Sequence, residues 1–182
     1  MAAQALRVWD LLVRAVHWSV AALIVVDLFN EAGANPWHRY LGYAAGALVL
    51  VRLAWGVLGR PHVRLTSIAK KAKIARRYVG ALGSRDKRHV YVAHTPLGAC
   101  MVLLMWTLIL FVVLTGWMQQ LDAFWGDELV QRTHSIAAYV LGACAVVHVA
   151  GVLVTSAGSG TNLVKGMITG KKVLPPGSMS ET

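Results

Sequence analysis

Charged residues are scarce in this 182-residue chain, and cysteine occurs only twice. Charged side chains make up 14% of the residues, hydrophobic ones make up 57%, and the mean hydropathy is +0.55. Such a composition argues against an ordinary soluble globular protein. Cys100 and Cys144 lie within apolar runs and follow neither the C-x-x-C-H pattern of covalent haem attachment nor a zinc-type spacing. We therefore expect both cysteines to pack as small apolar side chains.

Four apolar runs are long enough to cross a lipid bilayer as helices. With their flanks they cover about residues 15–31, 37–58, 94–118 and 132–156. An open chain in lipid can satisfy its backbone hydrogen bonds only as a helix. The sequence therefore predicts an all-α, integral membrane four-helix bundle.

The length of the chain favours one domain. We expect this membrane domain to occupy residues 1–172, with a basic loop at 59–92 between the second and third spans. Apolar and basic residues alternate in the segment 160–172, which should lie along the inner membrane surface. Residues 173–182, with two adjacent prolines and a polar end, are expected to form a disordered tail.

Acidic residues are few, and the distribution of charge indicates the topology. The chain has 8 acidic and 18 basic residues. Loop 59–92 is rich in arginine and lysine and has a single acid, Asp86, whereas the first and third connections carry mainly acids. Because basic loops stay on the cytoplasmic side, we expect a multi-pass, lipid-embedded protein of the bacterial cytoplasmic (inner) membrane with both termini in the cytoplasm. The charge thus marks topology, and no nucleic-acid partner is expected.

The fourth apolar run carries a histidine near each end, His134 and His148. Fourteen helical residues rise about 21 Å and return to nearly the same azimuth. Both imidazoles should therefore face one side of the helix at opposite membrane depths. A histidine in hydrocarbon needs a partner, and the iron of b-type haem is a metal often held by histidine.

Depth leaves few partners for these two histidines. At the outer level His38 is available to His134. At the inner level we expect His17 to pair with His148, because the fourth helix turns His148 toward the side that His134 uses, and His94 remains the alternative ligand. The sequence thus predicts two bis-histidine b haems within the bundle.

Other residues near the histidines are candidates for contact with the cofactor. Gly46 and Gly98 could make room for a porphyrin, although tight helix packing favours small residues equally well. Arg14 and Arg52, at the inner level, could pair with haem propionates or a quinone head. The alternative for both arginines is anchoring at the cytoplasmic surface.

The chain resembles the prokaryotic cytochrome b561 family, which includes the b-type cytochrome subunits of hydrogenases. The resemblance is carried by VWDLLVRAVHW at 8–18, WHRYLGY at 37–43, HTPLGA at 94–99 and HSIAAYVLGACAVVH at 134–148. It implies four core helices and two b haems, and these haems would be bound by the pairs His17 with His148 and His38 with His134. It also implies a quinone, ubiquinone or menaquinone, near the inner haem, with His94, Arg14 and Arg52 as its neighbours.

We accordingly expect a di-haem b-type membrane cytochrome that moves electrons across the cytoplasmic membrane. The electrons would pass between the quinone pool and a periplasmic partner such as a cytochrome c or a dehydrogenase subunit. One alternative is a superoxide oxidase that reduces quinone, and another is the membrane anchor of a hydrogenase or dehydrogenase complex. A superoxide oxidase would call for a cationic outer funnel, where only Arg39 and Arg132 are available. No catalytic residue is assigned, and whether the protein is itself a quinone-linked oxidoreductase stays open.

Overall fold

The computed structural model describes residues 4–30, 36–58, 64–73, 75, 89–91, 95–174 and 179–181. Its helical elements in chain order are α1 (Leu11–Leu28), α2 (Pro36–Leu58), α3 (Leu65–Lys73), α5 (Pro96–Met118), the short 3₁₀ helix η2 (Asp122–Phe124), α6 (Glu128–Ser159) and α7 (Leu163–Thr169). Its strands are β1 (Gln4–Arg7), β2 (His89–Tyr91), β3 (Lys171–Leu174) and β4 (Met179–Glu181).

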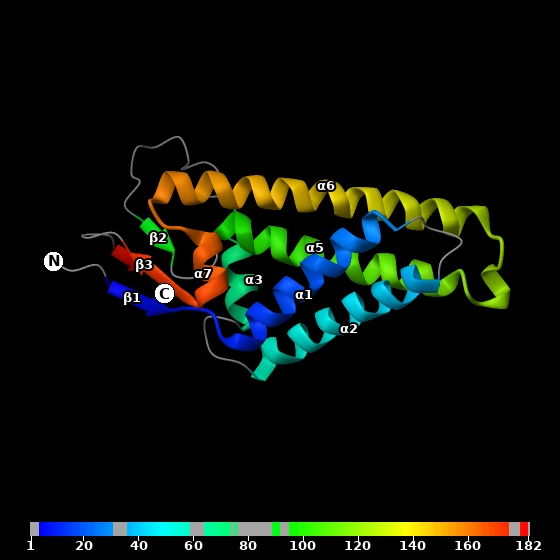
Figure 1. Ribbon diagram of the computed structural model, residues 1–182, viewed down its shortest axis with the longest axis horizontal. Coiled ribbons are helices and arrows are strands. Elements are labelled where there is room, and N and C mark those ends of the chain that lie inside the picture. The colour runs from blue at the N-terminus through cyan, green and yellow to red at the C-terminus, as the bar shows by residue number, and fades with distance from the viewer. Residues whose placement is uncertain are drawn as a thin grey trace.

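Four helices, α1, α2, α5 and α6, are long and apolar enough to cross a membrane. They contain 18, 23, 23 and 32 residues and lie roughly side by side in an elongated bundle (Figure 1). Large apolar side chains on their outer surfaces are exposed, as expected of helices that face lipid. The predicted all-α membrane bundle of four helices is therefore confirmed.

Local capping explains where α1 and α6 begin. Asp10 Oδ1 accepts a hydrogen bond of 2.8 Å from Val13 N–H, so α1 starts at Leu11, before the predicted start at 15. Asp127 Oδ1 accepts from Val130 N–H at 3.0 Å and starts α6 before the predicted residue 132. Short polar side chains at both positions thus lengthen the helices beyond their apolar stretches.

The bundle consists of two helix hairpins that meet in the middle. α1 packs on α2, α5 packs on α6, and α2 packs on α5. At the contact of α2 with α5, a Cβ added to Gly46 would lie 3.1 Å from a methyl carbon of Val113. The buried core lies where the hairpins meet and is formed by Val49, Ile109 and Leu141.

One end of the bundle, here the α7 end, carries α3, α7 and the strands β1 and β3 (Figure 1). β1 pairs with β3 in antiparallel register, and β2 pairs with β4 in parallel register. Gly170 ends α7 in the left-handed region (φ +77°) and turns the chain into β3, and its carbonyl accepts from Val8 N–H at 2.9 Å. The segment predicted to be amphipathic thus contains α7. β4 and the end of β3 lie within residues 173–182, which were expected to form a disordered tail. These two segments are strands because their backbone groups pair with β2 and β1.

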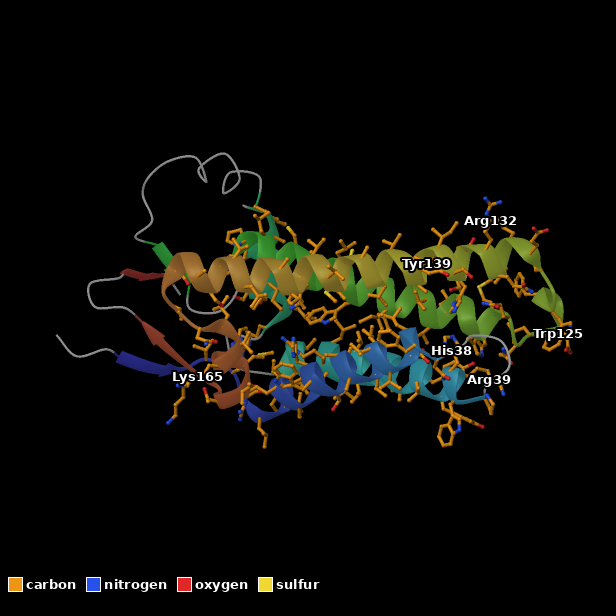
Figure 2. The ribbon with its side chains drawn as sticks, turned by 45° about the horizontal axis from the view of Figure 1, so that its top comes forward. His38, Arg39, Trp125, Arg132, Tyr139 and Lys165 are labelled. Carbon is orange, nitrogen blue, oxygen red and sulfur yellow. The ribbon has the colours of Figure 1, made fainter. Side chains whose placement is uncertain are left out.

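The opposite end, here the η2 end, contains η2, the start of α2 and the start of α6. Figure 2 shows Arg39, Trp125 and Arg132 at this end and Lys165 at the α7 end. Arg39 Nη1 donates to Gln120 Oε1 at 2.6 Å and so ties the start of α2 to the segment that follows α5. The bundle therefore has two chemically distinct ends, one of which carries every strand that the structure describes.

Candidate functional site

Two histidines face each other near the η2 end. His38 lies in the first turn of α2, and His134 lies in the second turn of α6. Their ring centroids are 6.0 Å apart, and the ring planes are nearly perpendicular at 85°. We call His38 and His134 the η2-end pair. The structure thus brings together the two histidines that the sequence analysis paired at the outer level.

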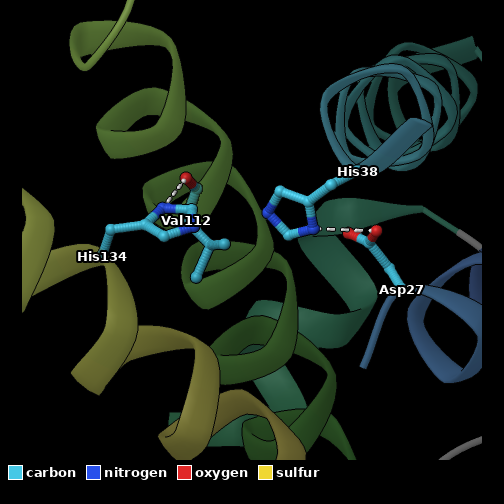
Figure 3. A network of polar contacts seen from close by, with 4 residues as sticks. All are labelled: Asp27, His38, Val112 and His134. Carbon is cyan, nitrogen blue, oxygen red and sulfur yellow. Dashed lines mark hydrogen bonds and ion pairs between the residues drawn. The ribbon is translucent and has the colours of Figure 1, made fainter. Parts of the chain in front are cut away.

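The ring nitrogens of the η2-end pair have distinct roles (Figure 3). His38 Nδ1 lies 2.9 Å from Asp27 Oδ1, and His134 Nδ1 lies 3.0 Å from the Val112 carbonyl oxygen. A carboxylate and a carbonyl can only accept, so each Nδ1 carries the proton and donates it. In the neutral imidazole each Nε2 then keeps its lone pair, which is the form that binds a metal.

α5 supports His134 through two further residues. Thr115 Oγ1 lies 3.1 Å from His134 Nδ1 and is held by hydrogen bonds to carbonyls one turn earlier in its own helix. A Cβ added to Gly116 would lie 3.1 Å from His134 Cε1, so the absence of a side chain there allows the ring to rest on α5. The imidazole of His134 is thus fixed both by hydrogen bonding and by close packing.

A second pair of histidines lies deeper toward the α7 end. His17 on α1 and His148 on α6 have ring centroids 6.3 Å apart and ring planes tilted by 53°. The rings of Trp18 and His17 meet edge to face, with ring centroids 5.2 Å apart. His17 Nδ1 is buried and has no hydrogen-bond partner within the described residues. We call His17 and His148 the α7-end pair.

α6 spaces the two pairs and a core residue evenly along one face. His134, Leu141 and His148 are seven residues apart, which is close to two helical turns, so all three project to the same side. Leu141 belongs to the buried core with Val49 and Ile109. An apolar layer therefore separates the two histidine pairs.

The residues present fit a metal held between two imidazoles at each pair. Two nitrogens at about 2 Å from one metal ion, each with its ring centroid about 1 Å further back, place the centroids roughly 6 Å apart. The observed centroid separations of 6.0 and 6.3 Å agree with this value. The orphaned Nδ1 of His17 also indicates that a group belongs beside that ring.

The rest of the donor set favours haem over a bare ion. Within the ranges that the structure describes, no group of three or more His, Cys, Asp or Glu side chains could hold a metal ion. A haem needs two axial ligands from the protein, because the porphyrin supplies the remaining ones. Along the described residues, α6 packs most closely on α5 and more loosely on α1 and α2, the helices that carry its partner histidines. Each pair therefore fits b haem.

The other predicted site residues have different surroundings. Arg14 Nη1 donates to the carbonyl of Ile168, so its guanidinium binds the last turn of α7. Arg52 is only 4% exposed, and its guanidinium carbon lies 5.1 Å from the ring centroid of Trp106. His94, the alternative ligand, lies outside the described residues.

Both glycines predicted to face a porphyrin have protein neighbours. Gly46 faces Val113 across the contact of α2 with α5, and the backbone N–H of Gly98 donates to Thr95 Oγ1 at 3.1 Å in the N-cap of α5. By contrast, a Cβ added to Gly42, one turn after His38, would meet no heavy atom within 4 Å in the described structure. Gly42 is therefore the glycine next to the η2-end pair that has open space beside it.

Sequence reasoning missed three residues that position the histidines: Asp27, Thr115 and Gly116. A signal existed for Asp27, because an acid near the end of an apolar span needs a polar partner. The next helix starts at the same end of the bundle and presents His38 there. Gly116 had no comparable signal, because its role depends on the rotation of α6 against α5.

Comparison with known proteins gives the family. Residues 8–170 match the family described as prokaryotic cytochrome b561, and this match covers most of the chain. No curated protein and no solved structure matches the chain significantly. The chain therefore belongs to the prokaryotic cytochrome b561 family, whose members are membrane b-type cytochromes that transfer electrons across the membrane.

Proposed function

We propose that the chain holds two b haems and transfers electrons between a quinone near the α7 end and a redox partner at the η2 end. The observation that carries this proposal is the presence of two imidazole pairs, at 6.0 and 6.3 Å, on opposite sides of one apolar layer. His38 with His134 would hold one haem, and His17 with His148 would hold the other. Bound b haem would supply a one-electron carrier, and two imidazole ligands would suit it to electron transfer rather than to oxygen chemistry.

The chain's own residues fix the geometry of this electron path. α6 supplies one imidazole to each site, and 14 residues of helix set the sites about 21 Å apart along its axis. Asp27 and the Val112 carbonyl orient the imidazoles of the η2-end pair. Leu141 and its neighbours exclude water between the sites.

Charge supports an orientation with the α7 end in the cytoplasm of a bacterium. α3 lies at the α7 end and carries Lys70, Lys71 and Lys73, whereas the loop at the η2 end carries Asp122 and Asp127. Positive charge is retained on the cytoplasmic side. The acids of the η2 end would then face the periplasm, where they would attract a basic partner such as a cytochrome c.

Arg52 is the best candidate for binding the head group of a quinone. It lies within the apolar helix α2 and is almost completely buried against Trp106. A charged group at this depth is costly, so it is expected to serve a function. A guanidinium can donate to a quinone oxygen and stabilise negative charge as that oxygen is reduced. Arg14 is a weaker candidate because it binds the carbonyl of Ile168.

The cofactor count is the direct test of the proposal. The purified full chain should give a reduced-minus-oxidised spectrum of b type, and pyridine haemochrome quantitation should give two haems for each chain. A preparation with full structural integrity but one haem or none would contradict the proposed electron path.

Replacing Arg52 with leucine tests the quinone site. Loss of a charge-assisted hydrogen bond costs about 1.5–3 kcal/mol, so the KM for quinol should rise roughly 10- to 100-fold. The measurement is stopped-flow reduction of the oxidised protein in lipid nanodiscs by a short-chain ubiquinol or menaquinol. Arg39→Leu, at the η2 end, is the matched control, and the quinol should reduce this variant at the wild-type rate. Wild-type kinetics in Arg52→Leu would remove this residue from the quinone site.

A further inference from the structure

Asp27 is an acidic residue inside an apolar, membrane-spanning helix, and it contacts a proposed haem ligand directly. Its Oδ1 lies 2.9 Å from His38 Nδ1, and the two side chains are 18% and 27% exposed. The ion pairs of the described residues include none between Asp27 and a lysine or arginine. Within the described residues, the imidazole of His38 is therefore the ion-pair partner of this carboxylate.

The three other paired histidines lack such a contact in the part of the chain that the structure describes. His134 donates to a backbone carbonyl, which is polar but carries no net charge. His17 Nδ1 is buried and has no hydrogen-bond partner there. The ion pairs likewise include none between an acid and His148. Among these four histidines, His38 is thus the one that receives a carboxylate.

We propose that Asp27 is a positioning residue that lowers the reduction potential of the haem at the η2-end pair relative to the haem at the α7-end pair. This inference rests on the proposed function, since it requires both haems. A carboxylate that accepts the Nδ1–H of an axial histidine makes the imidazole more basic. It also brings negative charge near the iron, in surroundings where charges are poorly screened. Both effects favour the ferric state, which has one more positive charge than the ferrous state.

The consequence is a difference in reduction potential between two otherwise similar sites. Both sites have two imidazole ligands, so the identity of the ligands does not distinguish their potentials. The carboxylate on His38 introduces the distinction through a hydrogen bond. The energetically downhill direction for an electron then runs from the η2-end pair to the α7-end pair.

Asp27→Asn tests the proposal because asparagine keeps the shape and the acceptor oxygen but removes the charge. The full-length holoprotein is titrated by spectroelectrochemistry, and the data are fitted with two one-electron components. We expect the lower-potential component to rise so that its ferric-to-ferrous ratio falls about tenfold at a given potential, a shift of about 59 mV. The other component should not move. The component that moves should be the one that is missing in His134→Ala.

Two further variants serve as controls. Asp27→Glu retains the charge, so its lower-potential component should stay close to the wild-type potential. Asp122→Asn removes one acid from η2, at the same end of the bundle but outside the membrane-spanning helices, and should leave both components in place. An Asp27→Asn protein in which neither component moves, or in which both move equally, overturns the role of Asp27 while leaving the two haems intact. A wild-type protein without two haems instead overturns the proposed function, whereas a wild-type protein whose two haems titrate at one potential overturns this inference alone.

A measurement on the wild-type protein covers the case in which Asp27→Asn fails to retain the haem. Redox-difference infrared spectroscopy is performed on protein labelled with ¹³C in the aspartate carboxyl groups. An aspartate carboxylate band that follows the potential of the lower component supports the proposal. If no label-sensitive band follows that component, the carboxylate is not coupled to the haem, and the proposal is wrong.

Discussion

Replacing His134 with alanine removes one of the two b haems, and replacing His148 removes the other. Each substitution deletes an imidazole that faces its partner across about 6 Å, so one of the two side chains that would hold that haem is lost. The remaining site is anchored by different side chains and is separated from the first by the Leu141 core. Pyridine haemochrome quantitation should therefore fall from two haems to one in each single variant and to none in the double variant.

The partner histidines provide the matched comparison. His38→Ala should lose the same spectral component as His134→Ala, and His17→Ala should lose the same component as His148→Ala. His94→Ala should retain both haems. If His94→Ala loses a haem while His17→Ala keeps both, the pairing at the α7 end is wrong, and His94 is the ligand that pairs with His148.

A leucine at Gly116 should remove the haem of the η2-end pair without altering any ligand. A Cβ at this position would already lie 3.1 Å from His134 Cε1, and the longer leucine side chain would push the ring away from α5. The ring would then lose its hydrogen bond to the Val112 carbonyl and its alignment with His38. We expect one haem per chain by the same quantitation, with the spectrum of the α7-end site unchanged.

Gly158→Leu is the control for this substitution. Gly158 is also a helical glycine, but a Cβ there would meet no heavy atom within 4 Å among the described residues. This variant should retain both haems, and leucine should favour the helix over glycine. Full haem content and an unchanged spectrum in Gly116→Leu would show that packing against α5 does not position His134.

The four spanning helices could be predicted from the sequence, because the membrane leaves a chain few options, whereas the strands at the α7 end could not. Backbone groups in lipid must be paired within a helix, so long apolar stretches such as residues 96–118 become spans regardless of detailed packing. The ends of the helices were less predictable. They depend on single side chains, such as the Asp10 carboxylate that starts α1.

Depth alone paired His38 with His134, whereas at the other end it left both His17 and His94 as possible partners of His148, and it said nothing of the surroundings of these rings. Counting residues along antiparallel helices places His38 and His134 at one depth and leaves one outcome. Rotation about the helix axis is not available from such counting, so the roles of Thr115 and Gly116 beside His134 were not expected. The contact of Arg14 with α7 could not be predicted either, because only tertiary packing brings α7 to the start of α1.

The apolar layer around Leu141 has a consequence for energy conservation. Its members, including Val49 and Ile109, are hydrophobic, and none of these described side chains could relay a proton between the two sites. In the proposed function each turnover would therefore be electrogenic. Moving one elementary charge through 100 mV is worth about 2.3 kcal/mol. The voltage of the energised membrane would thus act directly on the rate and extent of turnover.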